Sequence, residues 1–479
     1  MAPPESSKTD LVVIGAGPGG YAAAFRAADL GREVVLIDPG QAPGGVCLNT
    51  GCIPSKALLH ATSLIREARE AGAMGLEFGE PGVDLGRLRA WKEKVVGGLT
   101  GGLAGLAKSR KVEHVVARAR LTGPDSLVLE GGERDGEAIA FEQAILATGS
   151  SAVVPGSLAT DDPRLMTSEE ALALVDIPEN LLVVGGGYIG LELGTVYATL
   201  GSKVTCVEAT TALLPGVDSD LVRPLARRLD GLFEEILLDT TAELAGATDS
   251  GLTMKLSGKG DSQERVFSKV LVAVGRGPNS EGLGLGSTDV ATDEEGFVEV
   301  DASGATSVST IFAIGDLAGQ PMLAHKATHQ GQVAAEAASG HAAAFEPATV
   351  PAVVFTDPEI AWAGLTETEA KETGRDIKVG RFPWVASGRA ATLGGGEGMT
   401  KLIADPGTEE VLGIGVVGRG AGDLISEGAL AVEMGAVARD LSMTVHPHPT
   451  LSETVMEAAD VLLGRAISIH RPARGEKKK

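Results

Sequence analysis

Two cysteines, Cys47 and Cys52, lie five positions apart in the sequence GGVCLNTGCIPSK, which spans residues 44–56. The four intervening residues allow the chain to fold back, so that the two sulfur atoms can meet in a disulfide. Pro54 is typical of the start of a helix, where the helix dipole and Lys56 would stabilise a thiolate at Cys52. In a chain with three cysteines, this close pair predicts redox chemistry or metal binding rather than a structural cross-link.

The cysteines also allow less reactive interpretations. The same spacing is compatible with two ordinary buried thiols. A zinc site is disfavoured, because His60 is the one further His or Cys nearby and a structural zinc ion takes four ligands. We therefore predict no metal. The third cysteine, Cys206, lies in an apolar run and is expected to be a core residue.

The residues that precede the cysteines predict a nucleotide-binding unit. An apolar strand over 11–14 meets the turn GAGPGG, a helix over 21–30 follows, and a second strand over 34–37 ends in Asp38. Asp38 lies 23 positions after the first glycine, near the ~20 expected of a carboxylate that accepts a hydrogen bond from a ribose hydroxyl. Glycines in such a turn let the backbone approach a pyrophosphate at the helix N-terminus. The glycines of this fingerprint are Gly15, Gly17 and Gly20.

A second fingerprint repeats the pattern. A strand over 181–184 meets GGGYIG, a helix runs to Leu200, and a strand over 203–207 ends in Glu208, again 23 positions after the first glycine. One glycine-rich turn is a weak signal, but two in the same order of elements predict two dinucleotide sites. A flavin held at one site and a nicotinamide exchanged at the other would allow electrons to pass between them. The turn of the second fingerprint contains Gly185, Gly187, Tyr188, Ile189 and Gly190.

Glu208 predicts NAD rather than NADP as the exchanged nucleotide. A carboxylate at this position accepts from a ribose 2′-hydroxyl and repels a 2′-phosphate. Residues 209–214 contain no Arg or Lys that would favour the phosphate. The second fingerprint resembles that of glutathione reductases, in which a tyrosine at the position of Tyr188 covers the nicotinamide pocket, and ordinary packing at the helix start explains Tyr188 equally well.

The rest of the chain predicts an α/β fold with two Rossmann-like dinucleotide-binding domains and a C-terminal α+β domain. Apolar runs over 144–149, 270–276 and 311–316 could each return a strand beside a nucleotide. Asp316 ends the last of them, either as a turn former or as an acceptor for a ribityl or ribose hydroxyl. From about Pro347 the composition changes to strands over 352–355, 399–403 and 412–417 and a helix over about 426–441.

Composition excludes several classes of function. The 479 residues include 41 Lys plus Arg and 64 Asp plus Glu, for a net charge of −23, which disfavours binding to nucleic acids and anionic membranes. The sequence contains no run of about 18 apolar residues that would span a bilayer. The first ten residues have neither a signal-peptide apolar stretch nor an Arg-rich presequence, so we expect a cytoplasmic protein.

The cysteine segment, both fingerprints, the sequence Ala-Ile-Gly-Asp and the C-terminal HPHPTLSE (446–453) together resemble the dihydrolipoyl dehydrogenase family of class I pyridine nucleotide-disulfide oxidoreductases. The resemblance covers roughly residues 8–465. It implies an FAD-binding domain over 1–152, an NAD-binding domain over 153–276, a central segment over 277–347 that completes the FAD site, and a dimerisation domain over 348–479.

The resemblance also implies a role for each catalytic residue. Cys47 would exchange disulfides with dihydrolipoamide, and Cys52 would be the thiolate that faces the flavin. His448, supplied by the other subunit of a homodimer, would be the base, oriented by Glu453. Lys56 near the flavin and Glu192 would form an ion pair. From the residues alone, Thr450 and Glu453 also fit a helix capping box, and His446 and His448 fit turn positions.

Further residues are implied to contact the two cofactors. For FAD they are Gly15, Gly17, Gly20, Asp38, Gly45, Val46, Lys56, Ala119, Thr148, Gly149, Asp316 and Ala324. For NAD they are Gly185, Gly187, Tyr188, Ile189, Gly190, Glu208, Gly275 and Arg276. Ala119 departs from the family, which usually has glycine there, and a backbone contact with the adenine would tolerate alanine.

The resemblance implies a lipoylated partner, either the acyltransferase core of a 2-oxo acid dehydrogenase complex or the glycine cleavage H protein. Two other functions remain open. The chain could be a disulfide reductase of the same fold that acts on a different thiol, or a docking subunit whose acidic surface binds a basic segment of a complex core. The intact cysteine pair argues against the second.

Overall fold

The computed structural model describes residues 7–260 and 262–470, which form two compact units. Unit 1 contains the chain up to Ile177 and Leu271–Glu346, and unit 2 contains Pro178–Val270 and the chain from Pro347 onward. The domain boundaries expected at residues 152, 276 and 347 stay a prediction. Residues 1–6 of the first expected domain and 471–479 of the last lie outside the described residues.

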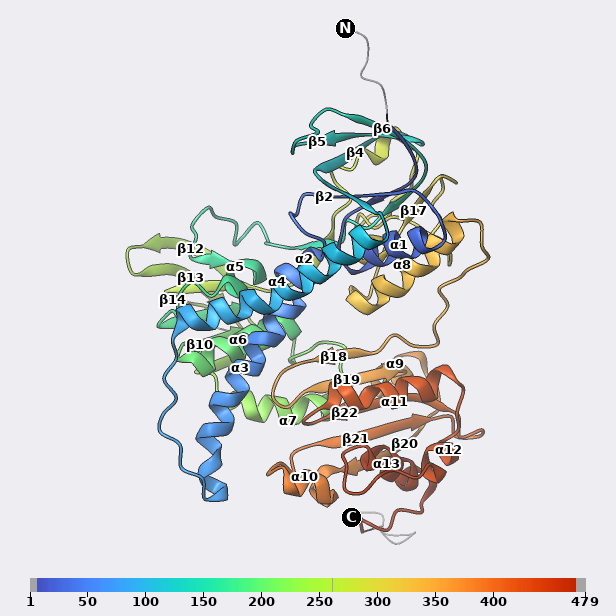
Figure 1. Ribbon diagram of the computed structural model, residues 1–479. Coiled ribbons are helices and arrows are strands. Elements are labelled where there is room, and N and C mark those ends of the chain that lie inside the picture. Colours follow the sequence, from blue (N-terminus) through green and yellow to red (C-terminus); the bar gives the residue numbers. More distant parts are fainter. Residues whose placement is uncertain (1–6, 261, 471–479) are drawn as a thin grey trace. The chain divides into compact units, whose positions relative to one another are not determined.

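Unit 1 is built on a seven-stranded sheet in the order β3-β2-β1-β6-β5-β4, with β17 also paired to β6 (Figure 1). Along β1, Leu11 and Val13 join one buried cluster with α1 and α8, whereas Val12 and Ile14 join another on the opposite face. A strand buried on both faces explains the unbroken apolar run. The strands are β1 (Ser7–Ile14), β2 (Val34–Asp38), β3 (Glu113–Val116), β4 (Arg118–Gly123), β5 (Ser126–Glu130), β6 (Ala138–Leu146) and β17 (Ile311–Ala313).

Helices α1 (Pro18–Asp29) and α8 (Ala324–Ala338) pack closely against each other. A Cβ atom at Gly331 of α8 would lie 2.4 Å from the carbonyl oxygen of Gly19, so only glycine permits this approach. The other elements of unit 1 are α2 (Gly45–Asn49), α3 (Cys52–Glu70), η1 (Ala71–Met74), α4 (Leu85–Ser109), β7 (Ser150–Ala152), β8 (Leu165–Met166), α5 (Ser168–Ala173), β16 (Arg276–Pro278), η2 (Leu285–Ser287) and η3 (Gly315–Ala318).

The first part of unit 2 contains the second fingerprint. Strands β9, β10 and β11 pair in parallel, with Val183 opposite Cys206 and Cys206 opposite Ile236. A separate antiparallel sheet joins β12, β13 and β14. The elements are β9 (Asn180–Val184), α6 (Tyr188–Leu200), β10 (Lys203–Val207), α7 (Ser219–Asp230), β11 (Glu235–Leu237), β12 (Thr241–Thr248), β13 (Gly251–Ser257), β14 (Ser262–Phe267) and β15 (Lys269–Val272), within which the chain passes into unit 1.

The C-terminal part of unit 2 is an antiparallel sheet in the order β18-β19-β22-β21-β20, packed against helices (Figure 1). The α/β class and the C-terminal α+β domain are therefore confirmed. Its elements are β18 (Ala352–Val354), β19 (Ile360–Gly364), α9 (Glu367–Thr373), β20 (Lys378–Pro383), η4 (Trp384–Ala386), α10 (Gly388–Thr392), β21 (Met399–Ala404), β22 (Val411–Val417), α11 (Ala421–Glu433), α12 (Ala438–Met443) and α13 (Glu453–Leu463).

The single helix expected over 426–441 is wrong. The structure has two helices there, α11 and α12, separated by a turn at Gly435. Gly435 has φ 60°, a left-handed conformation that ends helices and that glycine adopts without strain. The sequence prediction followed the Ala and Met content and overlooked this stop signal. Among the described residues, no helix is long and apolar enough to cross a bilayer.

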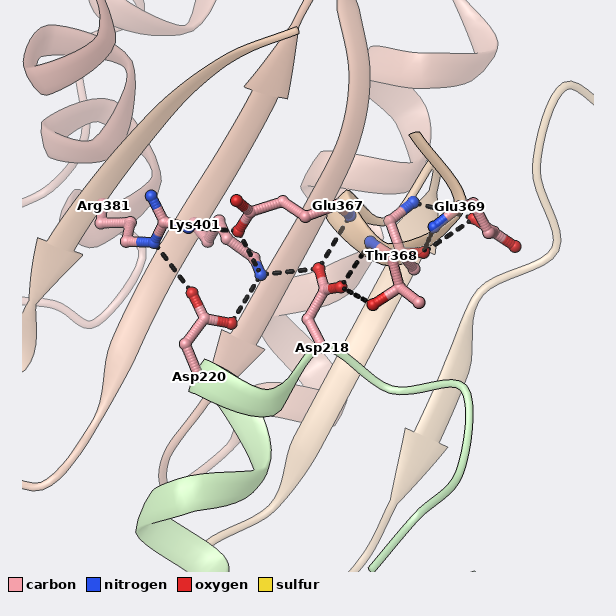
Figure 2. Close-up of polar contacts among 8 residues, drawn as sticks. Asp218, Asp220, Glu367, Thr368, Glu369, Arg381 and Lys401 are labelled. Carbon is pink, nitrogen blue, oxygen red and sulfur yellow. Dashed lines mark hydrogen bonds and ion pairs between the residues drawn. The ribbon is translucent and has the colours of Figure 1, made fainter. Parts of the chain in front are cut away.

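A buried lysine organises the contact between α7 and the C-terminal sheet (Figure 2). The Lys401 side chain is 1% exposed, and its Nζ lies 2.6 Å from Asp218, 2.7 Å from Asp220 and 2.9 Å from Glu367. Arg381 also pairs with Asp220 and Glu367. Burial opposes the charge on Lys401, but the bonds to these carboxylates raise its pKa above the ordinary value. The ammonium group thus occupies the place between three acidic groups that could otherwise hold a metal ion.

Replacing Lys401 by methionine is expected to lower the free energy of unfolding by about 3–5 kcal/mol, because it leaves the buried carboxylate of Asp218 without its cation. Lys378→Met is the matched control, because the Lys378 side chain pairs with Glu409 and is 39% exposed. This substitution should lower the free energy of unfolding by less than about 1 kcal/mol. Urea unfolding followed by circular dichroism measures both. Equal midpoints for the two variants would contradict the expectation.

Candidate active site

The cysteine segment lies against the turn of the first fingerprint. Cys47 is in α2, and Cys52 is the first residue of α3, as Pro54 predicted. The N–H of Gly44 donates to the carbonyl oxygen of Ala16 at 2.8 Å. A Cβ atom at Gly45 would lie 2.6 Å from Cα of Gly17, so the backbone of α2 starts in direct contact with this turn.

The two thiols interact with each other. The structure holds Cys47 and Cys52 as thiols, so their disulfide stays a prediction. The hydrogen bond to Cys52, followed by burial and by the charge at Cys52, raises the pKa of the Cys47 thiol, and Lys56 opposes this shift only in part. In the reduced pair, Cys47 therefore favours the protonated thiol over the thiolate.

Cys206 differs from this pair. It is fully buried in β10, and burial raises the pKa of its thiol to about 12. Such a thiol is inert at neutral pH, in agreement with the expectation of a core residue.

The first fingerprint fits a pyrophosphate. Gly15 has φ +103°, and a Cβ atom at Gly20 would lie 1.8 Å from the Gly15 carbonyl oxygen, so these two glycines close the turn. By contrast, a Cβ atom at Gly17 would meet nothing within 4 Å, so Gly17 borders open space. Helix α1 begins there with no side-chain cap and no acidic residue in its first turn. Its N–H groups can therefore receive an anion.

Asp38 lies at the end of β2, where the sequence places it. Its Oδ2 accepts from the N–H of Ala16 and its Oδ1 from the N–H of Gly40, both at 2.8 Å. The carboxylate thus fixes the fingerprint turn. Each oxygen has a second lone pair that can accept from a ribose hydroxyl.

A hydrogen-bonded chain extends from Arg276 to Asp316. Nε of Arg276 donates to Oγ of Ser150 at 2.7 Å, and Ser150 donates to Oδ2 of Asp316 at 2.5 Å. Lys326 is buried nearby and donates to the Gly315 carbonyl at 3.4 Å. Burial lowers the pKa of Lys326, and Asp316 opposes that shift. Oδ2 of Asp316 is therefore held by Ser150, and a contact between Asp316 and a ligand hydroxyl stays a prediction.

The sequence prediction missed Ser150, Lys326 and Asn279. Asn279 exchanges two hydrogen bonds of 2.9 Å with Thr148, which lies directly after β6 beside Gly149. Ser150 could have been predicted as a polar site residue, because it belongs to the polar run that begins at Thr148 after an apolar strand. Nothing local to Asn279 or Lys326 indicates their partners.

Four other predicted FAD residues lie in unit 1. Val46 follows Gly45 in α2, Lys56 is in α3, Ala119 is buried in β4, and Ala324 begins α8. Their contacts with the cofactor stay predictions.

The second fingerprint repeats the geometry of the first. A Cβ atom at Gly190 would lie 2.2 Å from the Gly185 carbonyl oxygen, whereas one at Gly187 would meet nothing within 4 Å. Glu208 follows β10, and its carboxylate accepts from the N–H groups of Gly186 at 2.7 Å and Thr210 at 2.8 Å. In both turns, the last glycine of the fingerprint contacts the carbonyl oxygen of the first, whereas the glycine between them borders open space.

The remaining residues predicted at the NAD site divide between the units. Tyr188 and Ile189 begin α6, with Tyr188 41% exposed. Gly275 and Arg276 belong to unit 1. Glu192 is buried in α6, where its Oε1 accepts from the N–H of Phe355 at 2.9 Å. Its ion pair with Lys56 stays a prediction.

His448 and Glu453 form a pair at the start of α13. Nδ1 of His448 lies 2.9 Å from Oε1 of Glu453, and 77% of the His448 side chain is exposed. The carboxylate also accepts from the N–H of Thr450 at 2.8 Å, so Glu453 holds the turn before α13 as well as the ring. The N-cap of α13 is Ser452 and has no side-chain cap, so the structure does not form the capping box that Thr450 and Glu453 also fit. Burial would raise the pKa of Glu453, but Thr450 and the two histidines hold it below its ordinary value. With Nδ1–H donated to a carboxylate, Nε2 can take a proton.

Two family models match the chain. Residues 9–331 match the pyridine nucleotide-disulphide oxidoreductase model, and residues 350–459 match the dimerisation domain of the same family. The two matches together span both fingerprints, the cysteine pair and the His448–Glu453 pair.

Curated relatives and solved structures align over nearly the whole chain. A dihydrolipoyl dehydrogenase from Vibrio parahaemolyticus is 46% identical over 95% of this chain and 96% of its own. One from Thermus scotoductus is 47% identical over 96% and 98%. The crystal structure of LpdA from Mycobacterium tuberculosis is 27% identical with a TM-score of 0.86, over 94% and 99% of the two chains. The flavoprotein disulfide reductase RclA from Escherichia coli is 26% identical with a TM-score of 0.82, over 95% and 99%.

Proposed function

This chain belongs to the pyridine nucleotide-disulphide oxidoreductase family, and from that premise we propose that it is an NAD-dependent dihydrolipoyl dehydrogenase. It oxidises protein-bound dihydrolipoamide to lipoamide through Cys47 and Cys52. FAD is its bound cofactor, and NAD is reduced to NADH. The observation that carries the proposal is the interacting Cys47–Cys52 pair at the start of α3, packed against the first fingerprint turn.

The residues present fit both cofactors. The pyrophosphate of FAD fits the open space at Gly17 and the uncapped start of α1. The ribose fits the remaining acceptor positions of Asp38, and Asp316 can accept from a further hydroxyl. Gly187 and Glu208 suit the same groups of NAD. When bound, FAD supplies the two-electron relay between the reduced cysteine pair and NAD.

The cysteines take up the electrons of the substrate in two exchanges. One thiolate of dihydrolipoamide attacks Sγ of Cys47 in the disulfide, which forms a mixed disulfide and releases Cys52 as a thiolate. The second substrate thiolate then attacks the substrate sulfur of that mixed disulfide, which closes the lipoamide ring and releases Cys47. The two electrons lost by the substrate are then held by the reduced pair.

The partner subunit's His448 accepts the thiol protons in these exchanges. Glu453 holds Nδ1, so that Nε2 is the proton acceptor, and its ionised carboxylate stabilises the imidazolium that forms. The dimerisation domain supports a homodimer in which each site uses a histidine of the other subunit. Such a base is needed because the attacking thiols of the substrate are protonated near neutral pH.

Glu208 sets the preference for NAD in this proposal. Glu208→Gln should lower kcat/KM for NAD by about tenfold to a hundredfold, because a neutral amide is a weaker acceptor for the ribose hydroxyls. Activity with NADP should fall less or rise, because the charge that repels a 2′-phosphate is lost. Glu234→Gln, an exposed carboxylate in the same unit, is the control. Steady-state NADH and NADPH formation measures both, and an unchanged NAD-to-NADP ratio would contradict the assignment.

In this proposal, another protein carries the lipoyl substrate, either a lipoylated acyltransferase core or a glycine cleavage H protein. The reaction takes place in the cytoplasm. A panel of dithiol and disulfide substrates tests this against the competing assignment to another thiol. Dihydrolipoamide should support NAD reduction, whereas glutathione should not. Faster turnover of glutathione would overturn the proposed substrate.

A further inference from the structure

His446 lies in an environment unlike that of His448, two residues along the chain. Its side chain is 5% exposed, against 77% for His448. Nε2 of His446 lies 2.7 Å from Oε1 of Glu427 on α11, and Nδ1 lies 2.9 Å from the carbonyl oxygen of Thr444. Both nitrogen atoms of this buried ring therefore face oxygen acceptors.

These two contacts differ in what a neutral and a charged ring could satisfy. A neutral imidazole carries one N–H, so it would satisfy one acceptor and turn a lone pair toward the other, whereas an imidazolium donates to both. The Glu427 carboxylate supplies the opposite charge that a buried cation requires. The contact between His446 and Glu427 ties the segment after α12 to α11.

The pair acts on the neighbouring His448–Glu453 pair in two ways. Because one residue separates His446 from His448, the anchor at His446 fixes the start of the segment that presents the His448 ring. The positive charge of His446 also reaches Glu453 and contributes to its lowered pKa. Two carboxylates from neighbouring elements interact with His446, Glu427 from α11 and Glu453 from α13.

We propose that His446 is a positioning residue whose imidazolium, held by Glu427, anchors the segment that presents His448 to Glu453 and places a positive charge near that carboxylate. The inference rests on the proposed function only where it takes His448 as the base. A packing role would require the size and shape of the histidine ring, whereas this role requires a cation that donates to Glu427.

The first test compares His446→Gln and His446→Lys in the full-length protein. Glutamine keeps an amide of similar size without charge, whereas lysine keeps the charge and a donor for Glu427. We expect kcat for dihydrolipoamide oxidation to fall about tenfold to thirtyfold in His446→Gln and at most about threefold in His446→Lys, with KM within about twofold in both. His341→Gln, an exposed histidine in unit 1, is the control and should leave kcat unchanged.

A double variant tests the partnership with Glu427. Because the two side chains act through one contact, adding Glu427→Gln to His446→Gln should lower kcat by less than about twofold further. Electron transfer from NADH to ferricyanide, which bypasses the thiol reaction, should be unchanged in every variant. Loss of this reaction in His446→Gln, or fully additive losses in the double variant, would overturn the proposal.

The second test does not depend on the substrate. The rate of His448 modification by diethyl pyrocarbonate, located by tandem mass spectrometry, is measured against pH, because only the unprotonated ring reacts. A nearby positive charge disfavours the protonated ring, so its loss in His446→Gln should move the half-maximal pH upward by roughly half a unit. An unchanged profile contradicts the proposal. If the parent protein fails to oxidise dihydrolipoamide, the proposed function falls, and this profile still decides the role of His446.

Discussion

Cys47→Ser is expected to lower kcat for dihydrolipoamide oxidation at least about a thousandfold. A serine hydroxyl cannot form the disulfide with Cys52 or the mixed disulfide with the substrate, so both sulfur exchanges are lost. The substitution keeps the size and position of the side chain in α2, and the flavin should remain bound. Absorbance of NADH during steady-state turnover measures the loss.

Two controls separate chemistry from structural damage. Cys206→Ala removes a buried thiol of β10 and should leave turnover within about twofold, after correction for any loss of stability. Electron transfer from NADH to ferricyanide should survive in Cys47→Ser, because it does not use the disulfide. Residual dihydrolipoamide turnover above about a tenth of the parent rate would exclude Cys47 as the interchange thiol.

His448→Gln is expected to lower kcat for the same reaction by about a hundredfold to ten-thousandfold, the range found for the loss of a general base. The substrate thiols are protonated near neutral pH. Without a base, they must ionise on their own before they can attack Sγ of Cys47. The rate of the variant should therefore rise with pH across the range in which thiols ionise, whereas the parent rate levels off.

Glu453→Gln is expected to lower kcat less than His448→Gln does. A glutamine can still accept from Nδ1 of His448, but it lacks the charge that stabilises the imidazolium, so its loss should be smaller than that of His448→Gln. A pH–rate profile for the three proteins gives both comparisons. A parent-like profile for His448→Gln would contradict the role of the base.

The local features of this molecule were predictable because their signals lie within short stretches of sequence. Apolar runs, glycine turns and terminal carboxylates placed β1, α1 and β2, and β9, α6 and β10, close to their observed bounds. Pro54 placed the start of α3 at the cysteines. In each case, backbone conformation and burial follow from the residues themselves.

Features that depend on distant residues were not predictable. Lys401 meets Asp218 and Asp220 across 183 and 181 positions, and nothing around Met399–Ala404 distinguishes this lysine from an exposed one. The chain from Arg276 through Ser150 to Asp316 likewise joins three separate segments. The contrast between a buried His446 and an exposed His448 also depends on a tertiary partner, Glu427 on α11.

The most direct test is the formation of NADH by purified protein given dihydrolipoamide and NAD, with NADP run in parallel. Fast turnover with NAD and little with NADP is the expected result, because it requires the cysteine pair, the flavin and Glu208 to act as assigned. No turnover in protein that still shows a flavin spectrum would contradict dihydrolipoamide as the substrate.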